Sequence, residues 1–287
     1  MATLTNFAPF KSFSINCQHR LIEFDHPVVM GILNISKDSF FDGGKYRAPD
    51  AMVLQAKKLI EGGSDIIDVG AVSTRPGAKL ADPEMESQVL ETAIRRLREE
   101  FPEVIISVDT CFSVPARRSV EAGADIINDI SGGQFDEEIF STIADLDVPY
   151  ILTHTRGLPH QMMDDTHYDD LIGDLAQYFS LRLGRLRSLG VKDVWIDPGF
   201  GFAKTAEQNF ELVRRLNELT ELFDEPLVVG FSRKSMIYNI LGCTSNEALN
   251  GTTVLNTLAL TQGARILRVH DPREARETIQ LITAVGE

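Results

Sequence analysis

Polar side chains that could take part in chemistry close a series of short apolar segments in this chain. They are Asn34, Asp68, Asp109, Asn128, His154, Asp197, the group 232–235, Arg268 and His270. Three of them, Asp109, Asn128 and Asp197, combine carboxylates with an amide and so offer acceptors and donors at fixed places. Such a set suits the edge of a flat, nitrogen-rich ring such as an aminopyrimidinone. Taken singly, Asp and Asn at these places also suit helix caps and turns.

Lys234, Arg268 and His270 form a second group, of cations, in the last fifth of the chain. Arginine presents a planar fork that matches phosphate oxygens, and lysine acts as a point charge. Because Arg268 and His270 lie two residues apart at the end of an apolar segment, an extended backbone places them on the same side. An ion pair at the rim of the fold is the structural alternative. The two groups together predict a site for a heterocycle that carries a pyrophosphate.

The stretch 30–44, MGILNISKDSFFDGG, passes from an apolar run into a polar loop that closes on two glycines. The loop begins at Asn34 and holds Asp38 and Asp42. Aspartate followed by glycine often only shapes a turn. Asn34 with Asp42 also supplies hard oxygen ligands, which suit an Mg²⁺ ion shared with the phosphates of a substrate.

Two further loops contain glycine and follow apolar segments: STRPG at 73–77 and DPGFGFAK at 197–204. Pro76 and Phe202 offer apolar faces for a second, aromatic substrate. Polar contacts to it are expected from Thr74, Arg75 and Ser235. Ordinary loop formation is the alternative explanation for Pro76, Phe200 and Phe202.

A repeated phrase indicates how these residues are positioned. GSDIID at 63–68, GADIIN at 123–128, GVKDVWID at 190–197 and GARILR at 263–268 each join a helix-ending glycine to a short apolar strand and a polar residue. Such a phrase predicts a repeated αβ unit. Further strands are predicted at 104–108, 149–153 and 226–229, and helices at about 49–60, 83–100, 168–189 and 246–262.

With the opening strand, the pattern gives eight strand and helix units, which predict a single (β/α)₈ TIM barrel over 27–287. FSINC and RLIEF predict a small β-hairpin within the segment 1–26 that covers one end of the barrel. Neither GxGxxG nor GxxxxGK[ST] follows a strand, which weakens the alternative of two nucleotide-binding halves. Since active sites of TIM barrels lie where the strands end, the polar residues should converge on one mouth.

The composition narrows the class of partner. The 287 residues are 43% hydrophobic and carry a formal net charge of −14. This charge argues against a nucleic-acid partner, although a few local cations can still bind a small anionic substrate. Three separated cysteines form no metal-spaced cluster and suit a reducing compartment. With no apparent signal or membrane segment, we expect a cytoplasmic protein without a membrane partner.

Seven motifs in a fixed order carry a family likeness. MGILNISKDSFFDGG, DVGAVSTRPGA, SVDT, INDISGG, IDPGFGFAKT, SRKS and RVHD resemble those of the dihydropteroate synthases over the span from about residue 27 to the C-terminus. Thr153 and Thr155 depart from the family pattern, because methionines are frequent at these places around His154.

The resemblance implies a transferase of folate biosynthesis. It would join 6-hydroxymethyl-7,8-dihydropterin pyrophosphate to para-aminobenzoate, giving 7,8-dihydropteroate and pyrophosphate. It further implies Mg²⁺ as cofactor, a homodimer, and sulfonamides as competitors of para-aminobenzoate.

The resemblance also implies roles for individual residues. Asn34 would bind the metal; Asp109, Asn128, Asp197 and Lys234 the pterin; Arg268 and His270 the pyrophosphate, with Thr74 beside it. Thr74, Pro76, Phe202, Lys234 and Ser235 would surround para-aminobenzoate. Asp42 would belong to a mobile first loop. Asp109, Lys234, Asp42, Arg268 and His270 are therefore the expected catalytic residues.

Two other functions fit part of the pattern. A methyltransferase domain that passes a methyl group from a folate to a corrinoid protein would share the pterin-reading residues, but has no evident need for Asp42, STRPG or RVHD. A homologue that binds pterin without catalysis is disfavoured, because every expected catalytic position is filled. The histidines form no HExxH pattern, which makes a catalytic zinc a poor interpretation.

Overall fold

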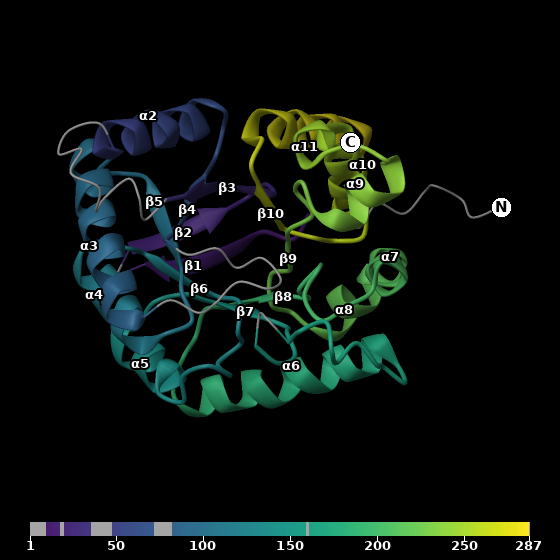
Figure 1. Cartoon of the computed structure of the whole chain (residues 1–287), viewed down its shortest axis with the longest axis horizontal. Coiled ribbons are helices and arrows are strands. Elements are labelled where there is room, and N and C mark those ends of the chain that lie inside the picture. Colours follow the sequence, from purple (N-terminus) through teal and green to yellow (C-terminus); the bar gives the residue numbers. More distant parts are fainter. Residues whose placement is uncertain (1–9, 18–19, 36–47, 72–81, 159–160, 287) are drawn as a thin grey trace.

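Eight parallel strands form a barrel, as the sequence predicts (Figure 1). The computed structural model describes residues 10–17, 20–35, 48–71, 82–158 and 161–286. The strands are β3 (Val28–Asn34), β4 (Ile66–Gly70), β5 (Ile105–Asp109), β6 (Ile126–Asp129), β7 (Tyr150–Thr153), β8 (Val194–Asp197), β9 (Val228–Val229) and β10 (Ile266–Val269). They pair in the order β8-β7-β6-β5-β4-β3-β10-β9. A single bridge between Ile196 and Leu227 brings the two ends of the sheet together and nearly closes the barrel.

The helices surround these strands (Figure 1). They are α2 (Ala48–Glu61), α3 (Pro83–Glu100), α4 (Ser113–Glu121), α5 (Ile139–Leu146), α6 (Leu171–Ser188), α7 (Ala206–Arg214), α8 (Leu216–Leu222), α9 (Ser235–Leu241), the 3₁₀ turn η1 (Ser245–Glu247), α10 (Leu249–Thr261) and α11 (Pro272–Gly286). Among these described helices, none has the length and apolarity needed to cross a bilayer.

The single helix predicted over 246–262 is wrong, because the stretch is divided into η1 and α10. The backbone N–H and the hydroxyl of Thr244 both donate to Glu247 Oε2, at 2.9 and 2.8 Å. This capping box starts a separate short turn before the longer helix begins.

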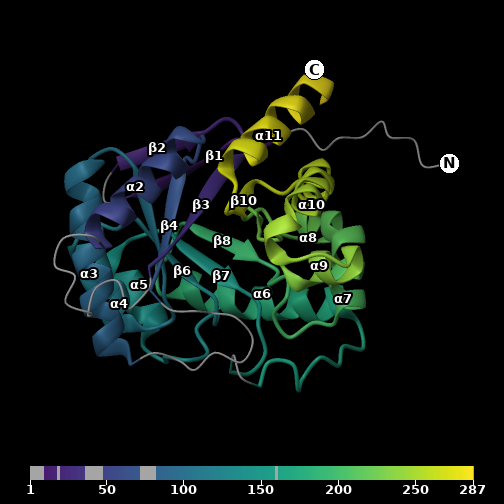
Figure 2. The same ribbon diagram turned by 45° about the horizontal axis from the view of Figure 1, so that its top comes forward.

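The predicted hairpin is present and covers the end of the barrel from which the strands start (Figure 2). It consists of β1 (Phe13–Cys17) and β2 (Arg20–Phe24). Its inner side chains Ile15, Cys17 and Phe24 are buried in one cluster with the first inward-facing residues of the barrel strands. The ring of Phe13 meets that of Trp195 edge to face, with centroids 5.8 Å apart. This end of the barrel is therefore apolar, which leaves the opposite end for a polar site.

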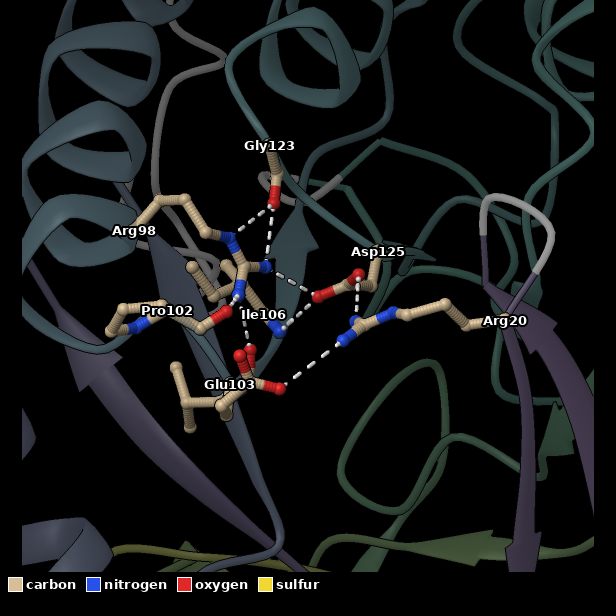
Figure 3. Close-up of polar contacts among 8 residues, drawn as sticks. Arg20, Arg98, Pro102, Glu103, Ile106, Gly123 and Asp125 are labelled. Carbon is tan, nitrogen blue, oxygen red and sulfur yellow. Dashed lines mark hydrogen bonds and ion pairs between the residues drawn. The ribbon is translucent and has the colours of Figure 1, made fainter.

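A recurring contact fixes the start of two barrel strands, and Figure 3 shows its copy at β5. Arg98 of α3 donates to the carbonyl of Gly123 at 2.7 Å and to Asp125 Oδ2 at 2.6 Å. The same Asp125 oxygen accepts the N–H of Ile106 at 2.9 Å, and its other oxygen accepts a bond from Arg20 of the hairpin at 3.1 Å. The repeated phrase thus contributes a carboxylate that joins helix, strand and hairpin.

The second copy of this contact involves Arg276 of α11. It donates to the carbonyl of Gly63 at 2.8 Å and to Asp65 Oδ2 at 2.5 Å, and that oxygen accepts the N–H of Val29 at 2.7 Å. The aspartate of the repeated phrase therefore has the same structural role at β3 as at β5.

Candidate active site

Polar side chains fill the barrel interior at the carboxyl ends of the strands. Asp68 of β4 is fully buried and accepts bonds from Ser107 Oγ at 2.7 Å, Asn128 Nδ2 at 3.2 Å and Arg268 Nε at 2.6 Å. Asn128 and Arg268 come from β6 and β10, so alternate strands supply one interior layer, as in other TIM barrels. Asn128 and Arg268, two predicted site residues from distant parts of the chain, are thereby brought together around Asp68.

Asp109, at the end of β5, lies beside this layer and shares Arg268 with Asp68. Its Oδ2 accepts a bond from Arg268 Nη2 at 2.7 Å. Burial raises the pKa of Asp109 to about 7, although the Arg268 charge acts in the opposite direction. Its Oδ1 is buried and has no hydrogen-bond partner within the described part of the chain. A polar ligand that reached this oxygen would satisfy it and remove the cost of leaving it unpaired.

A second unpartnered oxygen lies at the end of β7. Thr153 Oγ1 is buried without a partner among the described residues, and so is Thr155 Oγ1 in the following loop. Thr153 pairs in register with Asp197 at the end of β8. The two hydroxyls thus add unpaired polar atoms to this region, that of Thr153 on the strand beside Asp197.

Asp197 and Lys234 form the next part of the site. Asp197 Oδ1 accepts the N–H of Gly199 at 2.7 Å, which turns the chain at the end of β8. Burial raises the pKa of Asp197, against the nearby positive charge of Lys234. Burial likewise lowers the pKa of Lys234 to about 8, although Asp197 favours the ammonium. Each group therefore feels the charge of the other in a poorly solvated part of the site.

Phe202 contacts the same lysine. Lys234 Nζ lies 4.9 Å from the centre of the Phe202 ring and donates to the carbonyl of Phe200 at 2.5 Å. A cation at this distance from an aromatic face is attracted by it. The predicted residues Lys234 and Phe202 are thus brought together, whereas Ser235 is exposed at the start of α9.

His270 and Asn34 occupy the rim. His270 Nδ1 and Ser232 Oγ are 2.9 Å apart, and the N–H of His270 donates to the same hydroxyl at 3.1 Å. Arg268 and His270 therefore have different partners, the former deep in the barrel and the latter in the segment that follows β9. The side chain of Asn34 is exposed where β3 ends.

An Mg²⁺ site at the rim would draw on the side chains of Asn34 and Asp109. Asn34 Oδ1 and Asp109 Oδ2 each lie 3.7 Å from the position of a β-carbon built on Gly70, on the strand between them. Among the described residues, no three His, Cys, Asp or Glu side chains gather into a metal cluster. One amide oxygen with a carboxylate nearby fits an ion that takes most of its ligands from water and substrate phosphates.

Four predicted residues lie outside the described residues: Asp42, Thr74, Arg75 and Pro76. Conversely, the geometry adds residues that sequence reasoning did not place in the site. In the sequence Asp68 is only one of the polar strand ends, and Ser107 and Phe200 carry no signal of a role in the site. The signal of Asp68 is weak, because a strand-end Asp also suits a turn.

This fold and polar interior match a known class of proteins. Residues 30–270 match the family model described as pterin binding enzyme, so the chain belongs to the pterin-binding enzymes. Within that class it belongs to the dihydropteroate synthase family, which are transferases. It is 45% identical over 246 residues to the dihydropteroate synthase of Synechocystis sp., covering 85% of this chain and 84% of that relative.

Solved structures agree with this assignment. The Yersinia pestis dihydropteroate synthase in a sulfonamide drug complex superposes with a TM-score of 0.87 at 33% identity, covering 95% of this chain and 99% of that one. The Xanthomonas albilineans dihydropteroate synthase with 4-aminobenzoic acid gives 0.87 at 34% identity, with 96% and 98% covered. The family expected from the sequence motifs is therefore confirmed.

Proposed function

We propose that this chain joins 6-hydroxymethyl-7,8-dihydropterin pyrophosphate to para-aminobenzoate and releases pyrophosphate. The observation that carries the proposal is the interior arrangement around Arg268, where Asp68, Asp109 and Asn128 meet. It offers a mixed set of donors and acceptors with one unpaired carboxylate oxygen, which suits the amino and ring nitrogens of a pterin. Membership of the dihydropteroate synthase family supports the same reaction.

In this mechanism the pterin lies across the polar layer, with Asp109, Asn128 and Asp197 on its edge. Loss of pyrophosphate from the methylene carbon leaves positive charge that spreads into the ring. The Asp109 carboxylate offsets this charge, and preorganised groups of this kind contribute about 3 kcal/mol each to a transition state. Lys234 contacts the ring edge from the opposite side.

Arg268 and His270 stabilise the departing pyrophosphate. The guanidinium offers a planar fork to phosphate oxygens once it leaves one of its two carboxylate partners. Asn34 would hold an Mg²⁺ ion, which when bound neutralises pyrophosphate oxygens. The arylamine of para-aminobenzoate attacks as a neutral nucleophile held near Phe202, so that positioning matters more than a strong base.

Purified protein with the dihydropterin pyrophosphate, para-aminobenzoate and Mg²⁺ tests this proposal. Expected are pyrophosphate release and a dihydropteroate mass that both require para-aminobenzoate. Sulfonamide should raise the KM for para-aminobenzoate, a competition supported by the sulfonamide complex of the Yersinia pestis relative. Tight pterin binding without turnover would instead identify a silent homologue, and methyl transfer from a methyl-folate would identify the methyltransferase.

We also propose a homodimer in the cytoplasm. All three cysteines are free, which suits a reducing compartment. Exposed apolar side chains on α9 and α10, among them Ile240, Leu241 and Val254, supply surface for a second copy. Sedimentation equilibrium measures the mass, and a monomer at micromolar concentration would contradict the dimer.

A further inference from the structure

A buried lysine with no assigned role lies behind the site. The Lys204 side chain follows the loop 198–203 and is only 2% exposed. Its ammonium is within 3.2 Å of the carbonyls of Gly199 and Phe202 and 3.0 Å from His154 Nδ1. An ammonium has three protons, and here three acceptors surround it. Lys204 therefore joins both ends of the loop to the strand end of β7.

His154 is suited to be the third acceptor. Burial and the Lys204 charge lower the pKa of His154 well below its usual range, so the imidazole is neutral. Its ring is fixed by Tyr178, with centroids 4.6 Å apart in an edge-on contact. A neutral ring held in this way presents Nδ1 to the ammonium and carries its proton on Nε2.

The same loop is held from its other side by a site residue. Lys234 Nζ donates to the carbonyl of Phe200 and lies over the ring of Phe202. The loop carbonyls thus serve two lysines, those of Gly199 and Phe202 accepting from Lys204 and that of Phe200 from Lys234. A shift of the loop would move both Phe202 and the partner of Lys234.

We propose that Lys204 is a positioning residue, which with His154 holds the loop 198–203 so that Phe202 and Lys234 meet the aromatic second substrate. The inference deepens the proposed function and rests on it for the identity of that substrate. Lys204 has no contact with the site's polar layer among its hydrogen bonds, so it acts through the loop.

Burial makes the charged form of Lys204 costly to the fold. It lowers the pKa of Lys204 to about 7; Asp197 opposes this effect, while Lys234 and Arg156 add to it. The three acceptors around the ammonium offset this cost, and Lys204→Met would leave them buried without their donor. The variant should therefore lose some stability, so the positioning role needs a measurement that lost stability alone would not change.

The test is Lys204→Met, with the matched control Lys192→Met at the other end of β8, where the lysine side chain is 71% exposed. Calorimetry measures the affinity for para-aminobenzoate in the presence of pterin and pyrophosphate, and steady-state kinetics measures both KM values and kcat. Lys204→Met should weaken para-aminobenzoate binding and raise its KM by up to about 100-fold, the cost of a misplacement of about 1 Å, with the KM for the pterin substrate little changed. The urea midpoint should fall, because three buried acceptors lose their donor, and Lys192→Met should change neither KM nor midpoint.

His154→Phe provides a second variant, because it removes one acceptor and keeps the aromatic packing. It should weaken para-aminobenzoate binding less than Lys204→Met, and the double variant should equal Lys204→Met alone, since His154 acts through the lysine. The inference would be overturned if Lys204→Met left the affinity for para-aminobenzoate unchanged. It would also be overturned if the variant lost stability and the KM values of both substrates rose by the same factor. Wild-type protein that binds para-aminobenzoate but does not turn over would overturn the proposed function instead.

Discussion

Replacement of Asp109 by asparagine separates charge from shape at the centre of the site. Asp109 Oδ2 faces Arg268 Nη2 at 2.7 Å, and Oδ1 is buried without a partner among the described residues. In Asp109→Asn the amide must turn its oxygen to Arg268, because its NH₂ group would meet another donor there. The NH₂ group then occupies the place of Oδ1 and presents a positive edge to the pterin.

The size of the expected loss in kcat follows from this reversal of charge at the Oδ1 position. Removing one preorganised group from a charged transition state costs about 2–4 kcal/mol, which corresponds to between about 30-fold and about 1000-fold in kcat. The loss should appear in kcat with the KM for para-aminobenzoate little changed, because Phe202 and its loop are untouched. Pyrophosphate release coupled to a colorimetric enzyme, with mass detection of dihydropteroate, measures it.

The pH profile gives an independent signature of Asp109. Its pKa of about 7 means that the wild-type carboxylate ionises as pH rises through 7, so kcat/KM should rise there. Asp109→Asn should lack this rise. A folded pKa above the ordinary value of 3.8 also means that stability from this group is present at low pH and is lost as pH rises through 7. The variant should therefore gain stability relative to wild type above pH 7.

The result that would refute the reasoning is wild-type kcat in Asp109→Asn with an unchanged pH profile. Asp125→Asn is the matched control, since it makes the same substitution at the far end of the barrel. A similar kcat loss in both variants would show a general effect of losing a buried carboxylate rather than a role at the site.

Four further outcomes are expected. Asp125→Asn should lower the free energy of unfolding by about 3 kcal/mol in urea titrations, because it weakens a buried ion pair, with kcat at 25 °C retained. In wild type, kcat/KM should fall as pH rises above about 8, where Lys234 loses its proton, and Lys234→Met should be both slow and flat in that range. Gly199→Ala should reduce turnover by at least about tenfold, because φ of Gly199 is +71° and an added β-carbon would lie 1.9 Å from the carbonyl oxygen of His154. Gly190→Ala is the control and should stay active, because φ of Gly190 is +91° but no atom lies within 4 Å of the added β-carbon. A chelator should abolish turnover, and added Mg²⁺ should restore it. Asn34→Ala should need about tenfold more Mg²⁺ for the same activity. Activity that a chelator leaves unchanged would rule out the metal.

Four of the eight strands, β4, β6, β8 and β10, were the most predictable, because two local signals agree at each of them. A glycine ends the helix, as at Gly63 and Gly123, and an apolar run follows that is too short for a helix. Convergence of the polar strand ends followed from the fold class alone. The division at Thr244 was missed, although the spacing Thr244 to Glu247 is a capping-box signal.

The partners within the site were less predictable. Arg268 and Asp68 are 200 positions apart, and only the registers of the strands decide that they meet. The sequence grouped Arg268 with phosphate-binding cations, whereas the structure places it on two carboxylates. Lys204 was read as part of a loop motif, because no local pattern shows that a lysine side chain will be enclosed by carbonyls and an imidazole.

The contacts of Arg98 with Asp125 and of Arg276 with Asp65, together with the hairpin, lie at the end of the barrel away from the site. Folding and chemistry therefore draw on separate sets of residues in this chain. Substitutions in the loops of the mouth should therefore act first on turnover and on inhibitor affinity, with little loss of folded protein. Substitutions at the hairpin end should act first on the amount of folded protein.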